Sequence, residues 1–158
     1  MSLSITIRAE GIAGVDRALA RLTPLDSASL MQGLARLIQQ QTRRRIEGEK
    51  TSPDGKAWPP NRTGTSTLYR QGHLSRSIDY VAGATHLEVG SGLIYAAIHQ
   101  YGGTIVPKTK KVLSWRAGNQ QVFARKVTIP ARPYIGVSAA NGREILEETA
   151  AYIRRKLG

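Results

Sequence analysis

Three histidines are the residues of this sequence best suited to acid–base or metal chemistry. His73, His86 and His99 lie 13 residues apart, the chain has no cysteine, and none of the three has a second ligand nearby at the spacing of a metal site. The order His86-Leu87-Glu88 is similar to the His-x-Glu of zinc deaminases, but that site also needs a pair of cysteines. Alternate residues of a strand share one face, so we interpret this pair as part of a solvent-facing row.

Two other short stretches match catalytic motifs only in part. Residues 48–51 (GEKT) resemble the end of a phosphate-binding loop, but a residue separates the glycine from the lysine and the earlier glycine is missing. Residues 90–92 (GSG) lack the GxSxG spacing of a nucleophile elbow. The chain has only 11 Asp and Glu, none of them between Val89 and Arg143, which leaves no evident acid–base pair. We therefore predict that the protein is not an enzyme and uses neither a metal nor a cofactor.

The charge of the chain is strongly positive and unevenly distributed. Against 11 Asp and Glu stand 23 Lys and Arg, which gives a net charge of +12 and a pI near 10.6. Between Val89 and Arg143 there is no acidic residue, and a field of this sign attracts polyanions or an acidic protein partner. The basic residues of this block are Lys108, Lys110, Lys111, Arg116, Arg125, Lys126, Arg132 and Arg143.

Three basic clusters are candidate contacts for DNA phosphate or for an acidic partner, although each also fits a solvated helix end or loop. They cover residues 43–45, 108–111 and 154–156. The chain has one Phe and neither a zinc-finger nor an RNA-binding aromatic pattern, so any nucleic-acid contact should be non-specific. The residues expected to make DNA or acidic-partner contacts are Arg43, Arg44, Lys108, Lys110, Lys111 and Arg116.

Length and composition favour one globular domain over residues 1–158. Its 41% hydrophobic and 22% charged content is ordinary for such a domain. No apolar run approaches the roughly 20 residues that a membrane span needs, and the N-terminus lacks the basic-then-apolar order of a signal peptide. We expect a cytoplasmic product without membrane contact.

Hydrophobic spacing predicts the helices. Residues 15–22 follow helical spacing, and a longer helix begins at Asp26 or Ser27 and stops near Gly48, with Gln39, Gln40, Arg43 and Arg44 on its wet side. Short helices are expected over 68–78 and over 93–101, the second ended by Gly102-Gly103. Asn141 and Glu144 have the spacing of a capping box at the start of a C-terminal helix.

Alternation and turn residues predict the strands and loops. Strands are expected at 3–7, 78–82 and 85–89, and a second hairpin joins 112–116 to 121–129 around Gly118-Asn119. Residues 48–66 read as one long loop and 106–111 as a basic loop. The predicted fold class is α+β: an antiparallel sheet of two hairpins plus an N-terminal strand, packed against the long helix and the C-terminal helix.

Four stretches in order carry a family resemblance: SPDGKAWPP (52–60), LYRQGHLSRSI (68–78), LEVGSGLIYAAIHQYGGTI (87–105) and IPARPYIGVS (129–138). Together they resemble the phage virion morphogenesis family, which includes tail completion proteins of Mu-like and related tailed phages. The resemblance spans residues 27–157. IHQYGG and IPARPYIG together are specific to this family, whereas each stretch alone would be weak evidence for it.

Two of these stretches contain the expected partner interface. On a short helix the side chains of residues 95–101 spread around the axis, so one side packs on the sheet while Tyr101 or His99 stays near the surface. Pro130 and Pro133 hold the second stretch extended beside residue types that favour interfaces. The alternatives are a buried turn and a plain strand-to-helix connection. The expected interface residues are Tyr95, His99, Tyr101, Arg132 and Tyr134.

The resemblance implies a structural protein of the phage neck or tail end. Such a protein acts in tail completion and head–tail joining, and its related fold is a small α+β domain that assembles into a ring. The implied partners are other tail and head-connector proteins and further copies of the chain, assembled in the host cytoplasm and carried in the virion. The basic block leaves a second hypothesis open, a non-specific nucleic-acid-binding protein.

Overall fold

The computed structural model describes residues 3–7, 26–61, 64–109, 111–117 and 119–157. The helix predicted over 15–22 lies outside these residues. The structure confirms the expected α+β class. The elements are β1 (Leu3–Ile7), α2 (Ser27–Arg44), the π-helix η1 (Arg45–Glu49), α3 (His73–Arg76), β2 (Ile78–Ala82), β3 (Leu87–Ser91), α4 (Ala96–Tyr101), β4 (Gly103–Ile105), β5 (Leu113–Ala117), β6 (Gln120–Ala124), β7 (Val127–Ile129) and α5 (Ala139–Leu157).

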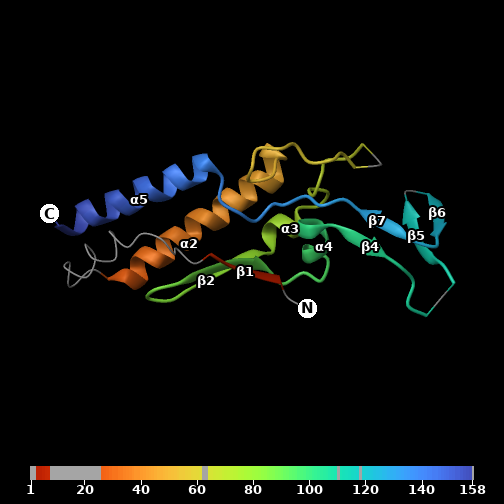
Figure 1. The fold of residues 1–158 in the computed structure, drawn as a ribbon, viewed down its shortest axis with the longest axis horizontal. Helices are drawn as coiled ribbons and strands as arrows, with labels where there is room; N and C mark the ends of the chain where they lie inside the picture. Colours follow the sequence, from red (N-terminus) through yellow and green to blue (C-terminus); the bar gives the residue numbers. More distant parts are fainter. Residues whose placement is uncertain (1–2, 8–25, 62–63, 110, 118, 158) are drawn as a thin grey trace.

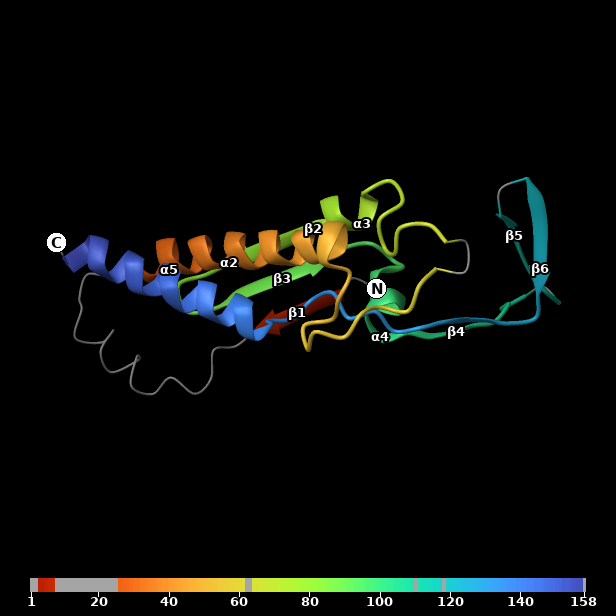
Figure 2. The same cartoon turned by 90° about the horizontal axis from the view of Figure 1, so that it is seen from above.

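The body of the molecule is one sheet covered by two helices. Strands β1, β3 and β2 form an antiparallel sheet in that order. Helix α2 packs on β2 and β3, and α5 runs alongside α2 (Figures 1 and 2). The apolar stripe of α2 meets the inward residues of the sheet to form the core, as its spacing predicted. The main contributors are Leu30, Leu34, Ala35, Ile38, Ile78, Leu87 and Val89.

Helix α2 starts where expected, and after Arg44 the helical chain continues as η1 to Glu49. The Asp26 carboxylate caps it by accepting from the backbone N–H of Ser29 at 3.1 Å. The predicted stop at Gly48 is wrong, because the chain continues through it as η1. Lys50, in the left-handed region with a φ of 56°, ends the helix by donating its N–H to the carbonyl of Arg45 at 3.0 Å.

Helix α5 begins one turn before the predicted capping box. The N–H of Asn141 donates to Ser138 Oγ at 3.1 Å, and the N–H of Ser138 donates to Asn141 Oδ1 at 3.4 Å. Ser138 is therefore the cap, and the pairing of Asn141 with Glu144 is wrong. Glu144 instead accepts from Gln41 at 2.9 Å and from Arg44, which ties α5 to α2.

The first hairpin forms largely as predicted. Strand 78–82 is confirmed, and its partner lies at 87–91 rather than at 85–89. The helix expected over 68–78 shrinks to α3, because Leu68 and Gly72 take φ values of 58° and 70°, which are incompatible with a continuous helix.

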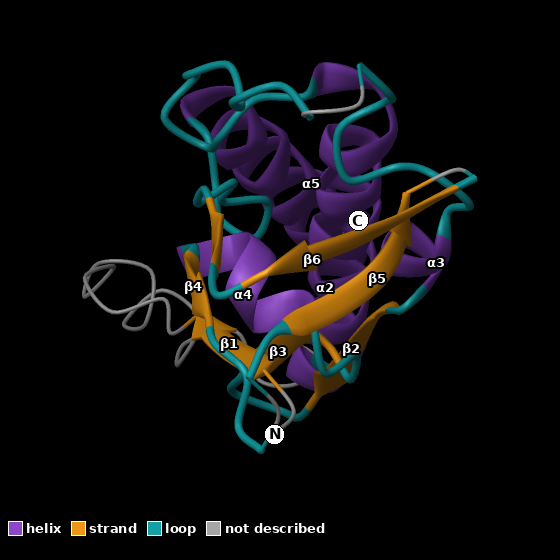
Figure 3. Cartoon of the chain, turned by 90° about the vertical axis from the view of Figure 1, so that its right-hand side faces the viewer, coloured by secondary structure: helices purple, strands orange, loops and turns teal. Residues whose placement is uncertain are grey.

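The second hairpin leaves the sheet and ends a projection from the body. The stretch predicted as one strand over 121–129 is split: β6 pairs with β5, while β7 pairs with β4. We call residues 103–129 the arm. Figures 1 and 2 show β4 and β7 leading away from α4 to β5 and β6, and Figure 3 looks along the molecule from that end, with the helices behind. In the described part of the chain, no helix is long and apolar enough to cross a membrane.

Candidate partner interface

Helix α4 ends at a glycine that lets two distant stretches touch. Gly102 has a φ of 71°, and a Cβ on it would lie 2.7 Å from the backbone nitrogen of Ala131. One residue further along, the N–H of Arg132 donates to the carbonyl of His99 at 2.8 Å. IHQYGG and IPARPYIG are thus packed against each other, and the predicted glycine stop is confirmed.

Gln100, a buried residue of α4, holds IPARPYIG against this helix through three hydrogen bonds. Its Oε1 accepts from the N–H groups of Tyr134 and Ile135 at 2.9 and 3.1 Å, and its Nε2 donates to the carbonyl of Ile135 at 3.1 Å. The Tyr134 hydroxyl donates to the carbonyl of Ala96 at 3.1 Å, and burial raises the pKa of this hydroxyl. Tyr134 is fully buried, so it positions α4 instead of meeting a partner in the isolated subunit.

Two buried arginines hold the same region from behind. Arg132 is 5% exposed and donates to the carbonyls of Pro59 and Pro60 at 2.8 and 3.1 Å, so it too supports the surface without forming it. Arg45 is also buried, and its guanidinium donates to the carbonyl of Tyr134 at 2.9 Å. Burial lowers the pKa of both guanidinium groups. Arg45 lies seven positions after the core residue Ile38, so the two side chains share the inner face of the helix. This spacing could have predicted that Arg45 is buried.

The remaining expected interface residues lie along α4 on more than one side of the helix. Tyr101 is 61% exposed, and Tyr95 is exposed next to Ile94, which is 87% exposed. His99 is half-buried and meets the edge of Tyr95 with the ring centroids 5.9 Å apart. Burial, together with the nearby charge of Arg132, lowers the pKa of His99. Tyr95 and Tyr101 form the exposed aromatic surface of α4. The buried hydrogen bonds of Gln100 and Tyr134 hold the helix beneath it in place.

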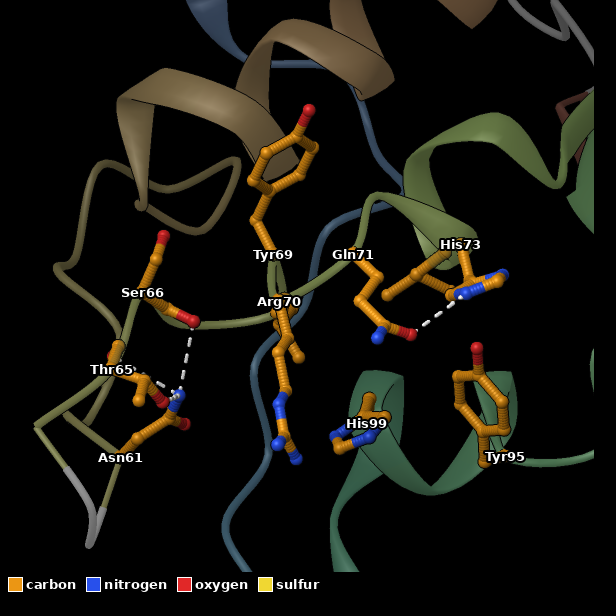
Figure 4. A pocket seen from close by; sticks show the side chains of 11 residues that line it. Asn61, Thr65, Ser66, Tyr69, Arg70, Gln71, His73, Tyr95 and His99 are labelled. Carbon is orange, nitrogen blue, oxygen red and sulfur yellow. Dashed lines mark hydrogen bonds between the residues drawn. The ribbon is translucent and has the colours of Figure 1, made fainter. Parts of the chain in front are cut away.

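A pocket of about 310 Å³ opens beside this surface. Figure 4 shows one wall made by the segment that leads into α3 and the other by α4. Two of the motif stretches, LYRQGHL and YAAIHQ, therefore meet here. The lining residues are Asn61, Thr65, Ser66, Leu68, Tyr69, Arg70, Gln71, His73, Leu74, Tyr95 and His99. Spacing along the chain gave no sign of this pocket, because it depends on how the two stretches pack.

The structure does not bring residues 43–45 together as one exposed basic patch. Arg43 is half-buried and donates to the carbonyl of Ile78 at 2.8 Å. Arg44 is exposed but forms an ion pair with Glu144 at 2.9 Å. Both expected contact residues are thus engaged within the body, and Arg45 is buried.

The arm presents the other expected cations and has no interior of its own. None of its residues whose burial is described is buried, and Phe123 and Trp115 are 64% and 37% exposed. Lys108, Lys111 and Arg116 are all exposed on it. Lys110 lies outside the described residues. A lone two-stranded ribbon is at best marginally stable in water, so the arm is suited to being covered by another molecule.

The register of β5 and β6 divides this end of the arm into two faces. Trp115 lies opposite Val122, and Leu113 lies opposite Ala124, which places these four apolar side chains on one face. Arg116 lies between them in sequence and points to the other face. The arm therefore offers an apolar surface on one face, and on the other face Arg116 lies beside Ser114, Gln121 and Phe123.

The histidines do not meet in a catalytic arrangement. His73 and His99 line the pocket, whereas His86 is exposed in the turn of the first hairpin. Among the described residues, no group of three or more His, Cys, Asp or Glu could hold a metal ion.

Comparison with known proteins gives the context for these surfaces. The chain is 35% identical over 82 residues to the putative capsid assembly protein G of Escherichia phage Mu, a match that spans 52% of this chain and 43% of the Mu protein. No solved structure matches the chain significantly. The model of the phage virion morphogenesis family matches residues 11–154, and the chain belongs to that family.

Proposed function

We propose that this protein is a structural component of the phage neck or tail end, and that it acts in tail completion and head–tail joining as a ring of identical subunits. Family membership supports a role in phage assembly. The observation that carries the finer proposal is the arm, which projects from the body without burying any of its described side chains.

The arm favours a ring for a physical reason. It leaves the body at one end, as Figure 2 shows, and in our proposal it packs on the body of a neighbour, so that the contact joins two different surfaces. A contact of this kind, repeated around an axis, closes into a ring or continues as a filament. A ring is the form that fits the end of a tube, and the exposed aromatic surface of α4 supplies a further contact area for tail or head-connector proteins.

The protein acts through these contacts and transforms no molecule. Its partners are further copies of the chain and other virion proteins, and its place is in the virion. The support for this is membership of a virion morphogenesis family and the similarity to a putative capsid assembly protein.

Removing the gene from an inducible phage tests the proposed stage of assembly. Electron microscopy of the lysate is expected to show DNA-filled heads and separate tails that do not join. Restoring the chain should restore joined particles. A lysate that lacks heads altogether would contradict the proposal and indicate a role in building the capsid instead.

The second candidate is non-specific nucleic-acid binding, which the cations of the arm favour. Replacing Lys108, Lys110 and Lys111 by Ala tests it. If this loop binds DNA, the slope of log K against log salt for duplex binding should become shallower by about 0.9 for each phosphate that the loop no longer neutralises. An unchanged slope together with normal particle assembly would remove DNA binding from the function of this loop.

A further inference from the structure

We propose that the pocket between residues 65–74 and α4 is a socket for a carboxylate side chain presented by an acidic segment of a partner protein. The inference rests on the proposed function in one respect, namely that this segment belongs to another virion protein. The preference of the pocket for a carboxylate is argued from its own lining residues and does not depend on the proposed function.

The pocket has no negative charge of its own and one guanidinium free to bind. None of its lining residues is Asp or Glu. Arg70 is exposed and makes no hydrogen bond or ion pair with any described residue. A guanidinium presents two parallel N–H donors to a carboxylate, and such charge-assisted pairs are stronger than neutral hydrogen bonds. Arg70 is therefore the expected anchor.

His99 supplies a second polar group on the opposite wall. Its Nδ1 is buried and has no hydrogen-bond partner among the described residues. The positive charge of Arg132 lies close enough to disfavour protonation of the His99 ring. An incoming carboxylate would offset that field and stabilise the protonated imidazole, so binding should raise the pKa of His99. This shift gives the socket a signature that a purely structural pocket would lack.

Several other polar groups of the pocket already have hydrogen-bond partners, which narrows the choice of ligand. The Asn61 amide donates to Thr65 and Ser66, and His73 is hydrogen-bonded to Gln71 at 3.0 Å. The rest of the lining is largely apolar or aromatic, with Leu68, Leu74, Tyr69 and Tyr95. Such walls suit the methylene stem of a glutamate and its apolar neighbours, and a volume of about 310 Å³ suits one or two side chains.

The surroundings favour a protein carboxylate over a nucleic-acid backbone. A protein that binds a nucleic-acid backbone usually has a row of unpaired basic side chains along the path of the phosphates. Here the nearby Arg76 donates to the carbonyl of Gln71 at 2.7 Å, and Lys50 donates to the carbonyls of Ile46 and Thr67. One free guanidinium over an apolar floor matches a single carboxylate.

The test uses two blocked tripeptides, acetyl-Leu-Glu-Leu-amide and acetyl-Leu-Gln-Leu-amide, titrated into the full-length chain. Binding and the pKa of His99 are followed by NMR of the histidine side chains. The Glu peptide should bind about tenfold more tightly than the Gln peptide, which corresponds to one charge-assisted pair, and should raise the pKa of His99. The variant Arg70→Gln should lose this preference.

Arg116→Gln is the matched control, because it removes the same charge from an exposed position on the arm. It should keep the preference for the Glu peptide. Because Arg70 and Arg116 are both exposed and unpaired among the described residues, both variants should unfold at the same urea concentration as the original chain.

Three outcomes would overturn the socket. They are equal binding of the two peptides, an unchanged preference in Arg70→Gln, and displacement of the Glu peptide by a short DNA duplex that binds more tightly through Arg70. The gene-removal experiment fails or succeeds separately. Joined particles without the gene would refute the proposed function while a Glu-selective pocket still stood.

Discussion

Arg45 shows how a basic residue serves the interior of this protein. Its guanidinium donates to the carbonyls of Tyr134 and Gly136, each at 2.9 Å, and to the side chain of Asn141. It thereby joins the end of α2 to the stretch that holds α4 and to the first turn of α5. The two carbonyls are buried or half-buried and take their hydrogen bond from Arg45, whereas Asn141 also accepts from the N–H of Ser138.

Replacing Arg45 by Met should destabilise the fold strongly. The change leaves buried acceptors without a donor, and we expect the free energy of unfolding in urea to fall by about 3 kcal/mol. Arg44→Met is the control: it removes an exposed ion pair with Glu144 and should lower the same quantity by less than about 1 kcal/mol. Equal losses in the two variants would contradict the structural role of Arg45.

His99 makes stability depend on pH in a defined direction. Burial holds its pKa below that of a histidine in an unfolded chain, about 6.5. The unfolded state therefore binds more protons, so this contribution to stability is complete above about pH 6.5 and is lost as the pH falls below it. The melting temperature should drop less between pH 7.5 and 5.5 in His99→Gln than in the original chain. His73→Gln, at an exposed position, should behave like the original, and a reversed order would refute this account.

At the scale of elements, the arm is separable from the body. Ile105 and Val127 are directly paired in β4 and β7, so an Asn-Gly turn can replace residues 106–126 and close a short hairpin. Because the removed residues include no buried side chain among those described, the free energy of unfolding should change by less than about 0.5 kcal/mol. Incorporation into particles should be abolished, as measured by the amount of the chain in purified virions.

A point variant makes the same comparison with less disturbance. Trp115→Ser removes apolar area from the arm and should reduce incorporation. Leu146→Ser removes apolar area from a site on α5 that is also exposed, and it should not. Equal incorporation of these two variants would mean that the apolar face of the arm is not an assembly contact.

Elements set by local spacing could be predicted from the sequence, and those set by distant partners could not. The stripe of α2, the cap at Asp26 and strand 78–82 follow from neighbouring residues. The split of 121–129 depends on two different partner strands, β5 and β4, which no local pattern reveals. At the start of α5, Ser138 caps the helix three residues before the predicted cap at Asn141, and Glu144 accepts a hydrogen bond from Gln41 of α2.

The candidate site shows the same limit. Tyr101 or His99 was expected near the surface: Tyr101 is exposed, whereas His99 is half-buried, and Tyr95, another expected interface residue, is exposed. Arg132 and Tyr134 have the residue types of an interface, but hydrogen bonds to Pro59 and Ala96 fix them inside. Residue type alone does not separate a buried polar clamp from a contact surface. The pocket around Arg70 exists only because two motif stretches that are distant in sequence pack side by side.

For the molecule as a whole, net charge opposes self-association while exposed apolar surface favours it. At +12, copies of the chain repel one another, and added salt screens that repulsion. Light scattering of the purified protein should show mainly monomer at about 0.05 M salt and a larger average mass at about 0.5 M. Dissociation on raising the salt would instead mean that ion pairs hold the subunits together.

The most direct test of the account is amide hydrogen exchange of residues 103–129 in the free chain and in completed particles. Because the arm is a lone ribbon in the free chain, its amides should exchange quickly there, through local opening. In the particle the same amides should be strongly protected, since a neighbour covers the arm. Equally fast exchange in both states would contradict the claim that this protein works by the surfaces it offers to its neighbours.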